Sequence, residues 1–214
     1  MAFIDTLVKL KNHVPGWVYD QLPQMLKYGV NGPKRMSHTL GQCRHETGNW
    51  TRLSENLNYT DPVRIANIFK SDFDLDKDKV IEPHEIEFAK KFVRRPEAMA
   101  NYVYQFQNGN GSEASGEGWK HRGFGPLQIT GKKNQVLAFR KMGLPDDTDP
   151  ERLAKDLAMA SAAVFFDNNS LWDECDRGVT ALDVKAVTRV VNPALLGLSE
   201  RVKYTQGFYK ILTS

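Results

Sequence analysis

The chain of 214 residues has only two cysteines, Cys43 and Cys175, too few for a disulfide framework. It also lacks any apolar run close to the ~20 residues that a membrane span needs. Its net charge is only +3, which is too small a basic excess to indicate nucleic-acid binding. What remains is ordinary for a globular protein, with 41% hydrophobic and 26% charged residues. We therefore expect no nucleic-acid partner and no stable membrane insertion.

The scarcity of cysteine and histidine also argues against two classes of peptidase. Cys43 lies on the apolar stripe of an expected helix, which predicts a buried thiol, and His45 two residues later points elsewhere. His45 and Glu46 could begin the zinc motif HExxH, but Asn49 stands where its second histidine belongs. The five histidines form no other ligand cluster, so neither a thiol peptidase nor a zinc peptidase or amidase has its residues.

The beginning of the chain, MAFIDTLVKLKNHV, predicts an amphipathic helix that contains Asp5 rather than a signal peptide. We therefore expect synthesis in the cytoplasm, so that any action outside the membrane requires a separate route across it. The length is that of a single domain with a good core.

Hydrophobic periodicity and proline positions predict a mainly helical chain. Two expected helices are apolar nearly all round, and we expect the second of these, 180–191, to form the central core. NGNGSEASGEGW (108–119) is too rich in glycine and serine to be a helix, and the following KHRGFGPLQITGKKN indicates a small strand or extended lobe. The expected helices are 2–12, 17–29, Pro33 to a stop at Gly48-Asn49, 62–70, 83–93, 96–107, 131–142, 151–172, 180–191 and the segment from Ser199.

Two carboxylic acids nine residues apart, Glu46 and Glu55, lie on either side of the helix end expected at Gly48-Asn49. Glu46 lies at the margin of the apolar stripe, where partial burial favours its neutral form. Because the helix stops, the chain can fold back and direct Glu55 toward Glu46 instead of placing it on the opposite face. One protonated acid facing one ionised acid is the arrangement that hydrolysis of a glycosidic bond needs.

The sequence around this pair resembles glycoside hydrolase family 19, the chitinase-type family that includes many bacteriophage endolysins. The first resembling block is His45-Glu46-Thr47-Gly48 followed by Glu55-Asn56-Leu57-Asn58-Tyr59. The second runs from the GNG…EASG loop through Trp119 to the Gln128, Thr130 and Asn134 run, and a later VTRVVN…GL…R run matches as well. Together the blocks cover roughly residues 33–204.

The resemblance implies a mainly α, lysozyme-like helical fold with a small extended or β lobe bordering an active-site cleft. It implies that Glu46 is the general acid and Glu55 the general base of an inverting mechanism, with Thr130 helping to hold the water. It also implies that substrate contacts come from Gln128, Asn134 and Asn192, although Pro193-Ala194 replace the family's glycines after Asn192. Tyr59 is a further candidate, and Trp119 and Trp50 offer flat faces for sugar rings.

The activity implied is that of a phage endolysin, a monomer in one catalytic domain spanning 1–214. It would cut β-1,4 bonds in peptidoglycan glycan strands, as a muramidase, without a catalytic cofactor. It would be made in the host cytoplasm, released by a separate holin, and act in the periplasm and cell wall. The mild positive charge would help association with an anionic envelope.

One segment, about 70–90, departs from the family. Read from Asp74, DLDKDKVIEPHE has the pattern of a twelve-residue EF-hand loop, which predicts a structural Ca²⁺ site. Lys79 stands at position 6, where glycine normally makes the sharp turn, so affinity should be reduced. The opposing interpretation is a charged surface loop whose lysines neutralise its aspartates. The expected ligands are Asp74, Asp76, Asp78, the Val80 carbonyl and Glu85, with Glu82 at position 9.

Two alternatives to the muramidase stay open. One is a chitinase that uses the same residues on a different polymer. The other, from a different functional class, is a calcium-binding interaction module, which the EF-hand loop alone would suggest. The sequence does not decide which glycosidic bond is cut.

Overall fold

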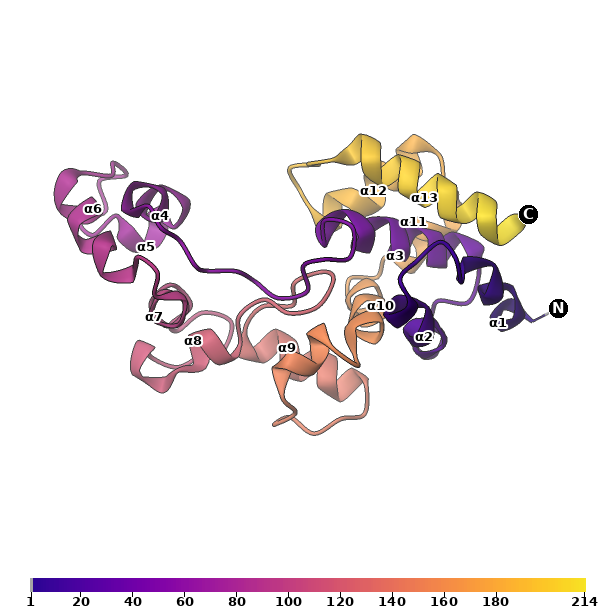
Figure 1. Ribbon diagram of the computed structural model, residues 1–214, viewed down its shortest axis with the longest axis horizontal. Coiled ribbons are helices and arrows are strands. Elements are labelled where there is room, and N and C mark those ends of the chain that lie inside the picture. The colour runs from indigo at the N-terminus through magenta and orange to yellow at the C-terminus, as the bar shows by residue number, and fades with distance from the viewer. Residues whose placement is uncertain (1) are drawn as a thin grey trace. The chain divides into compact units, whose positions relative to one another are not determined.

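The computed structural model describes residues 2–214, and its regular secondary structure is almost entirely helical (Figure 1). The chain packs as two compact units. The larger unit contains the chain up to Ser54, Phe124–Ile129 and Val136–Ser214, and the smaller unit contains Glu55–Gly123 and Thr130–Gln135. The mainly α, lysozyme-like class expected from the sequence is confirmed. The assignment of all 214 residues to one catalytic domain stays a prediction.

The larger unit is organised around α3, Pro33–Glu46. Pro33 occupies the first turn, where its missing N–H is no loss, and every residue from Met36 to Cys43 is buried. The helix packs closely against the last helix, α13 (Figure 1). The other helical elements with residues in this unit are α1 Phe3–Thr6, η1 Leu7–Leu10, α2 Gly16–Met25, η2 Leu26–Tyr28, α9 Lys132–Lys141, η5 Pro150–Ala154, α10 Ala158–Asn168, α11 Trp172–Arg177, α12 Ala181–Val191 and α13 Leu198–Thr213.

Two of the expected helices in this unit differ from the prediction. The helix expected over 151–172 is divided into η5 and α10, because Lys155 leaves the helical region at φ −120° and ψ −110°. The segment 180–191 does form α12, but the prediction that it is apolar all round and central was wrong. Only one face of α12 is buried, and Leu182 and Val190 are exposed. The buried helix α10 and the buried face of α3 contribute more of the core.

The smaller unit is a set of short helices around its own core. Buried apolar residues at its centre include Leu57, Phe73 and Met99, and α4, α5 and α6 lie together (Figure 1). Three of its helices begin with proline at the first position, as the sequence indicated. Its elements are α4 Pro62–Ile68, α5 Lys70–Phe73, α6 Pro83–Ala89, η3 Lys90–Phe92, α7 Pro96–Val103, η4 Glu113–Ser115 and α8 Glu117–Lys120.

The glycine-rich stretch 108–119 was expected to contain no helix, and that prediction was wrong. It forms the single turn η4 and the start of α8. Tertiary contacts hold these turns: the Trp119 N–H donates to Asn101 Oδ1, and Gly118 lies so close to α7 that a Cβ would approach the Ala100 carbonyl oxygen to 2.4 Å. The extended segment that follows forms the isolated β-bridges Ser54–Phe124 and Phe124–Ile129 rather than a strand.

Within residues 2–214, no helix combines the length and the apolar character that crossing a membrane would require.

Candidate active site

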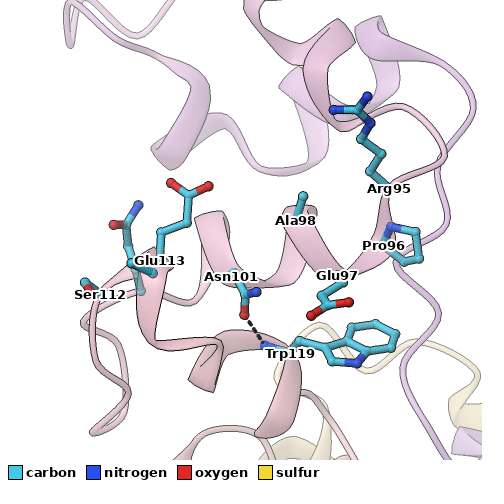
Figure 2. Close-up of a pocket in the computed structure, with 10 residues that line it drawn as sticks. Arg95, Pro96, Glu97, Ala98, Asn101, Ser112, Glu113 and Trp119 are labelled. Carbon is cyan, nitrogen blue, oxygen red and sulfur yellow. Dashed lines mark hydrogen bonds between the residues drawn. The ribbon is translucent and has the colours of Figure 1, made fainter.

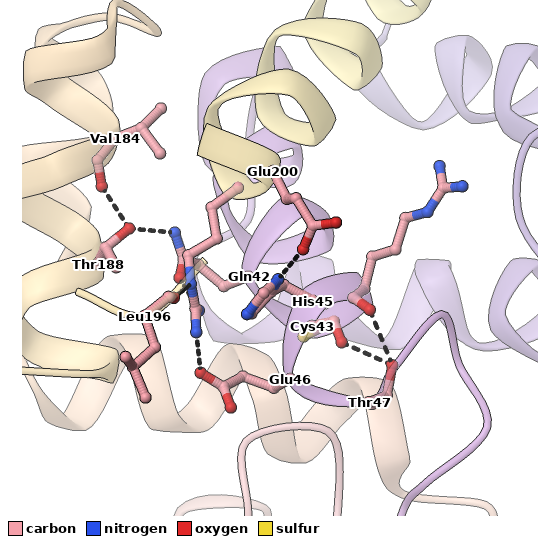
Figure 3. Close-up of polar contacts among 11 residues, drawn as sticks. Gln42, Cys43, His45, Glu46, Thr47, Val184, Thr188, Leu196 and Glu200 are labelled. Carbon is pink, nitrogen blue, oxygen red and sulfur yellow. Dashed lines mark hydrogen bonds and ion pairs between the residues drawn. The ribbon is translucent and has the colours of Figure 1, made fainter. Parts of the chain in front are cut away.

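The first candidate acid, Glu46, is the last residue of α3. Its side chain is 24% exposed, in keeping with the expected position at the margin of the apolar face. The guanidinium of Arg201 donates to Glu46 Oε1 at 2.5 Å (Figure 3). Glu46 therefore has a cationic partner from α13 that the sequence analysis did not assign.

Arg201 holds this carboxyl from a fully buried position. Its Nε donates to the Leu196 carbonyl, and a second terminal nitrogen donates to Gln42 Oε1. The Gln42 amide in turn donates to Thr188 Oγ1, whose hydroxyl donates to the Val184 carbonyl (Figure 3). All five donors of an arginine lie in one plane, so three fixed acceptors leave the group little freedom to turn. The network thus ties the end of α3 to α12 and α13.

The stop after Glu46 lies where the sequence predicted it. Thr47 Oγ1 donates back to the Cys43 carbonyl and accepts the Trp50 N–H. Gly48 and Asn49 then take positive φ of 57° and 63°, which ends the helix. Trp50 itself is 7% exposed and packs edge-to-face on Trp17, so the prediction that it offers a flat face to sugars was wrong.

The second candidate, Glu55, lies in the smaller unit. Its Oε1 accepts a 2.6 Å hydrogen bond from the Tyr104 hydroxyl, and its Oε2 accepts the Gly123 N–H at 3.2 Å. The Glu55 N–H also donates to the Gly123 carbonyl, which fixes the backbone beside the side chain. Burial, and then the adjacent Glu55 charge, raise the pKa of Tyr104, so this phenol stays a donor across the neutral range. The separation of the Glu46 and Glu55 carboxyl groups stays a prediction.

Gln128 and Asn134, which were expected to contact substrate, and Thr130, which was expected to help hold the water, all lie in the segment 125–134. The Gln128 amide donates to the Gly125 carbonyl, and Gln128 holds a positive φ of 51°. The Asn134 amide donates to the Thr130 carbonyl, so these two residues are close in the smaller unit. Asn134 is exposed, whereas Thr130 is half-buried.

Asn192 ends α12 in the larger unit, where its backbone N–H donates to the Thr188 carbonyl. Its own carbonyl accepts the Leu195 N–H, which closes a turn before Leu196. Thr188 and Leu196 both belong to the hydrogen-bond network of Arg201. Asn192 therefore lies next to the network that holds the Glu46 carboxyl.

Trp119 lines a cavity of about 980 Å³ within the smaller unit (Figure 2). The Arg122 guanidinium stacks over its ring at 3.8 Å from the centroid, so one face of the indole is occupied by a cation. Tyr59 packs edge-to-face on Phe69 and is only half-buried. The cavity's walls are α7, the η4 turn and α8, with Arg95, Pro96, Glu97, Ala98, Asn101, Gln105, Ser112, Glu113 and Ala114 as its other lining residues.

The peptidase alternatives gain no support from the geometry. Cys43 is fully buried as predicted, and burial raises the pKa of its thiol far above the usual range. His45 Nδ1 lies 3.0 Å from Glu200, and Asn49 accepts a hydrogen bond from Arg44. Neither arrangement supplies a thiolate–imidazole pair or a zinc ligand set.

Of the four carboxylate ligands that the EF-hand pattern predicted in 74–85, the structure groups three, and Asp78 lies outside that group. Asp74, Asp76 and Glu85 each offer an oxygen within 4.8 Å of the others. A second group, which shares Asp76, consists of Glu82 and His84. These residues could hold a cation, and they lie at the junction of α5 and α6.

Sequence reasoning missed the roles of Arg201 and Tyr104. Arg201 is the last residue of the VTRVVN…GL…R run that matches the family. Nothing in the sequence connects it to Glu46, which lies 155 positions earlier. Tyr104 follows α7 directly and carries no motif.

No family model matches the chain. A protein from Haemophilus influenzae, described as a glycosyl hydrolase family 19 domain-containing protein, is 37% identical to it over 200 residues. The match covers 92% of this chain and 90% of the relative, so it includes both resembling blocks and the segments between them.

Proposed function

Because this chain belongs to glycosyl hydrolase family 19 and is therefore a glycoside hydrolase, we propose that it is a muramidase-type endolysin. It would hydrolyse β-1,4 glycosidic bonds of peptidoglycan. The 37% identity over nearly the whole chain carries the glycoside hydrolase class on which the proposal rests. The choice of peptidoglycan is supported by the resemblance of residues 45–48 and 55–59 to the catalytic segments of phage endolysins, and by the net charge of +3.

In the proposed reaction, Glu46 is the general acid. Its Oε1 is held by Arg201, so Oε2 is the oxygen proposed to carry the proton to the leaving glycosidic oxygen. The proton transfer lets the bond break as positive charge develops on the sugar ring. The fixed guanidinium keeps the carboxyl in one orientation, which meets the geometric requirement for a general acid; a matched pKa is a separate requirement.

Glu55 is the proposed general base. Its two oxygens accept hydrogen bonds from Tyr104 and the Gly123 N–H, and these contacts orient the carboxylate. It would take a proton from a water that attacks the sugar carbon on the side opposite the leaving group, with Thr130 helping to hold that water. The product then has inverted configuration, and the carboxyl groups should be roughly 6.5–9.5 Å apart to admit the water.

Substrate would be held by the amides of Gln128, Asn134 and Asn192 and by the aromatic groups of Trp119 and Tyr59. Amide side chains both donate and accept, so they suit sugar hydroxyl and acetamide groups. No metal takes part in the proposed chemistry. The enzyme would act as a monomer, and a separate holin would release it from the host cytoplasm to the periplasm and cell wall.

A chitinase is the second candidate, because the same acid and base could act on a polymer of N-acetylglucosamine alone. Parallel assays of reducing ends released from purified peptidoglycan and from colloidal chitin test the choice. We expect release from peptidoglycan with little from chitin; the reverse preference would refute the endolysin proposal and favour a chitinase.

The acid and base roles are tested in the same assay. Glu46→Gln and Glu55→Gln keep shape but cannot exchange the required proton, so each should lose at least ~10²-fold in kcat. The matched control is Glu151→Gln, a change on η5 at a side chain that is 46% exposed, and it should leave kcat unchanged. A well-folded Glu46→Gln enzyme with full activity would remove Glu46 from the mechanism.

A further inference from the structure

The loop from Asp74 to Glu85 has no part in the proposed hydrolysis, yet it concentrates five carboxyl groups in twelve residues. We propose that this loop binds one Ca²⁺ through Asp74, Asp76, Asp78, the Val80 carbonyl and both oxygens of Glu85. The ion would be structural and would hold α5 against α6.

The first observation is the convergence of oxygens. Asp74, Asp76 and Glu85 present atoms within 4.8 Å of one another, although like charges at this spacing repel. Asp74 and Glu85 are also buried, with Asp74 6% exposed and Glu85 fully enclosed. The N–H groups of Leu75 and Glu82 donate to the two oxygens of Glu85, which compensates in part for its burial. Burying carboxylates next to one another remains unfavourable where neither a cation nor a hydrogen-bond donor replaces the lost water.

The second observation concerns Asp74 alone. Its Oδ2 accepts the Lys79 N–H at 2.9 Å, but its buried Oδ1 has no hydrogen-bond partner among residues 2–214. A buried carboxylate oxygen without a donor needs a partner that the protein does not supply. The carboxyl group that carries this oxygen belongs to the convergent cluster, so a cation there would satisfy it.

The lysines of the loop do not neutralise this cluster in the way that the opposing interpretation requires. Lys77 Nζ donates to the Ser71 carbonyl at 2.9 Å instead of to a loop carboxylate. Lys79 takes the sharp turn at position 6 with φ 71°, so the backbone makes the turn that glycine usually makes. The Lys79 N–H therefore still donates to Asp74, and the loop stays closed with lysine in place of the usual glycine.

The donor set favours calcium over other cations. Every proposed ligand is a carboxylate or carbonyl oxygen, which hard cations prefer, and six to eight such oxygens suit Ca²⁺. Mg²⁺ demands a tighter octahedron, and zinc would seek nitrogen or sulfur. The second group, Asp76, Glu82 and His84, includes one imidazole and is the place where zinc would compete.

The loop is coupled to the core of the smaller unit. Phe73 precedes Asp74 and packs in an aromatic cluster with Phe88, Phe92 and Tyr102. The Tyr102 hydroxyl donates to the Asp72 carbonyl, so α7 is attached to the chain entering the loop. An ion that fixes the loop should therefore raise the stability of the unit as a whole.

Thermal unfolding and calorimetric titration of the full chain test the site without relying on activity. We expect one Ca²⁺ per chain, and a melting temperature about 5–10 °C higher with CaCl₂ at a hundredfold excess over Kd than in EDTA. Glu85→Gln should abolish both effects, as should Asp76→Asn, which alters an exposed ligand and should leave folding intact. Glu87→Gln, an exposed change on the same helix α6, is the matched control and should keep both effects.

Three results would overturn the proposal. One is an unchanged melting curve between EDTA and millimolar CaCl₂ with no binding heat. Another is calcium binding that both Glu85→Gln and Asp76→Asn retain, which would place the ion elsewhere. The third is a preference for ZnCl₂ that His84→Gln removes, which would assign the loop to a different metal.

Discussion

A single hydroxyl group, that of Tyr104, makes the shortest contact to the Glu55 side chain, at 2.6 Å. Tyr104→Phe removes only this donor, and a hydrogen bond to a charged group contributes roughly 1.5–3 kcal/mol. We therefore expect kcat to fall at least tenfold with little change in KM, since the phenol positions the base rather than the substrate. Steady-state kinetics on solubilised peptidoglycan would measure this.

Tyr102→Phe is the matched control, because it removes a hydroxyl of the same segment that bonds to the Asp72 carbonyl. It should reduce stability and spare kcat. Equal kcat losses in the two variants would mean that Tyr104 acts only through folding.

His38 supplies a prediction about pH. The residue is buried in α3, its Nε2 donates to the Gly178 carbonyl at 2.8 Å, and its Nδ1 has no partner among residues 2–214. Burial lowers the pKa of His38, and the opposing effects of the Gly178 hydrogen bond, Asp183 and Asp176 are smaller. The unfolded chain therefore takes up this proton first as pH falls.

The stabilisation that neutral His38 provides is present above pH ~6.5, the ordinary histidine pKa, and is lost as pH falls toward the lower folded pKa. We expect the melting temperature to fall between pH 7.5 and 5.5. His38→Gln should flatten that fall, whereas His13→Gln, an exposed change, should not. Parallel curves for all three proteins would contradict the assignment.

Among the elements, the pair α3 and α13 depends on one glycine. A Cβ at Gly41 would lie 2.2 Å from Thr205 Oγ1 and 3.0 Å from the Thr205 backbone nitrogen, so the two helices approach too closely for any side chain there. Gly41→Ala should destabilise the protein by about 1–3 kcal/mol through overpacking. Urea unfolding measures the change.

Gly207→Ala is the control on α13, since no atom lies within 4 Å of the added Cβ. It should be neutral or stabilise by up to about 1 kcal/mol, because alanine favours the helix. The account of the α3–α13 contact fails if Gly41→Ala is as stable as Gly207→Ala.

Elements were predictable from the sequence where local chemistry determines them. Pro33 and the Gly48-Asn49 stop fixed both ends of α3, and prolines placed α4, α6 and α7. The short helix α8 was missed because its support comes from Asn101, a tertiary contact that overrides glycine content. The burial of α12 was overestimated because composition does not show which face meets the core.

For the whole molecule, the motif blocks were enough to indicate the family, and the 37% identical relative confirms it. The sequence also predicted both glutamates as the acid and the base, since their order and spacing form the motif, and these roles stay predictions. It could not supply the groups that hold them, because Arg201 and Tyr104 lie 155 and 49 residues away in the chain. Such contacts depend on the packing of distant segments, which spacing alone does not encode.

The central claim is that this glycoside hydrolase cuts the glycan strands of peptidoglycan. Mass spectrometry of borohydride-reduced muropeptides after complete digestion tests it most directly, with Glu46→Gln as the inactive reference. The account predicts new reducing ends on N-acetylmuramic acid and none with the variant. New reducing ends on N-acetylglucosamine would contradict the muramidase assignment, and freed peptides with intact glycan strands would contradict glycan cleavage altogether.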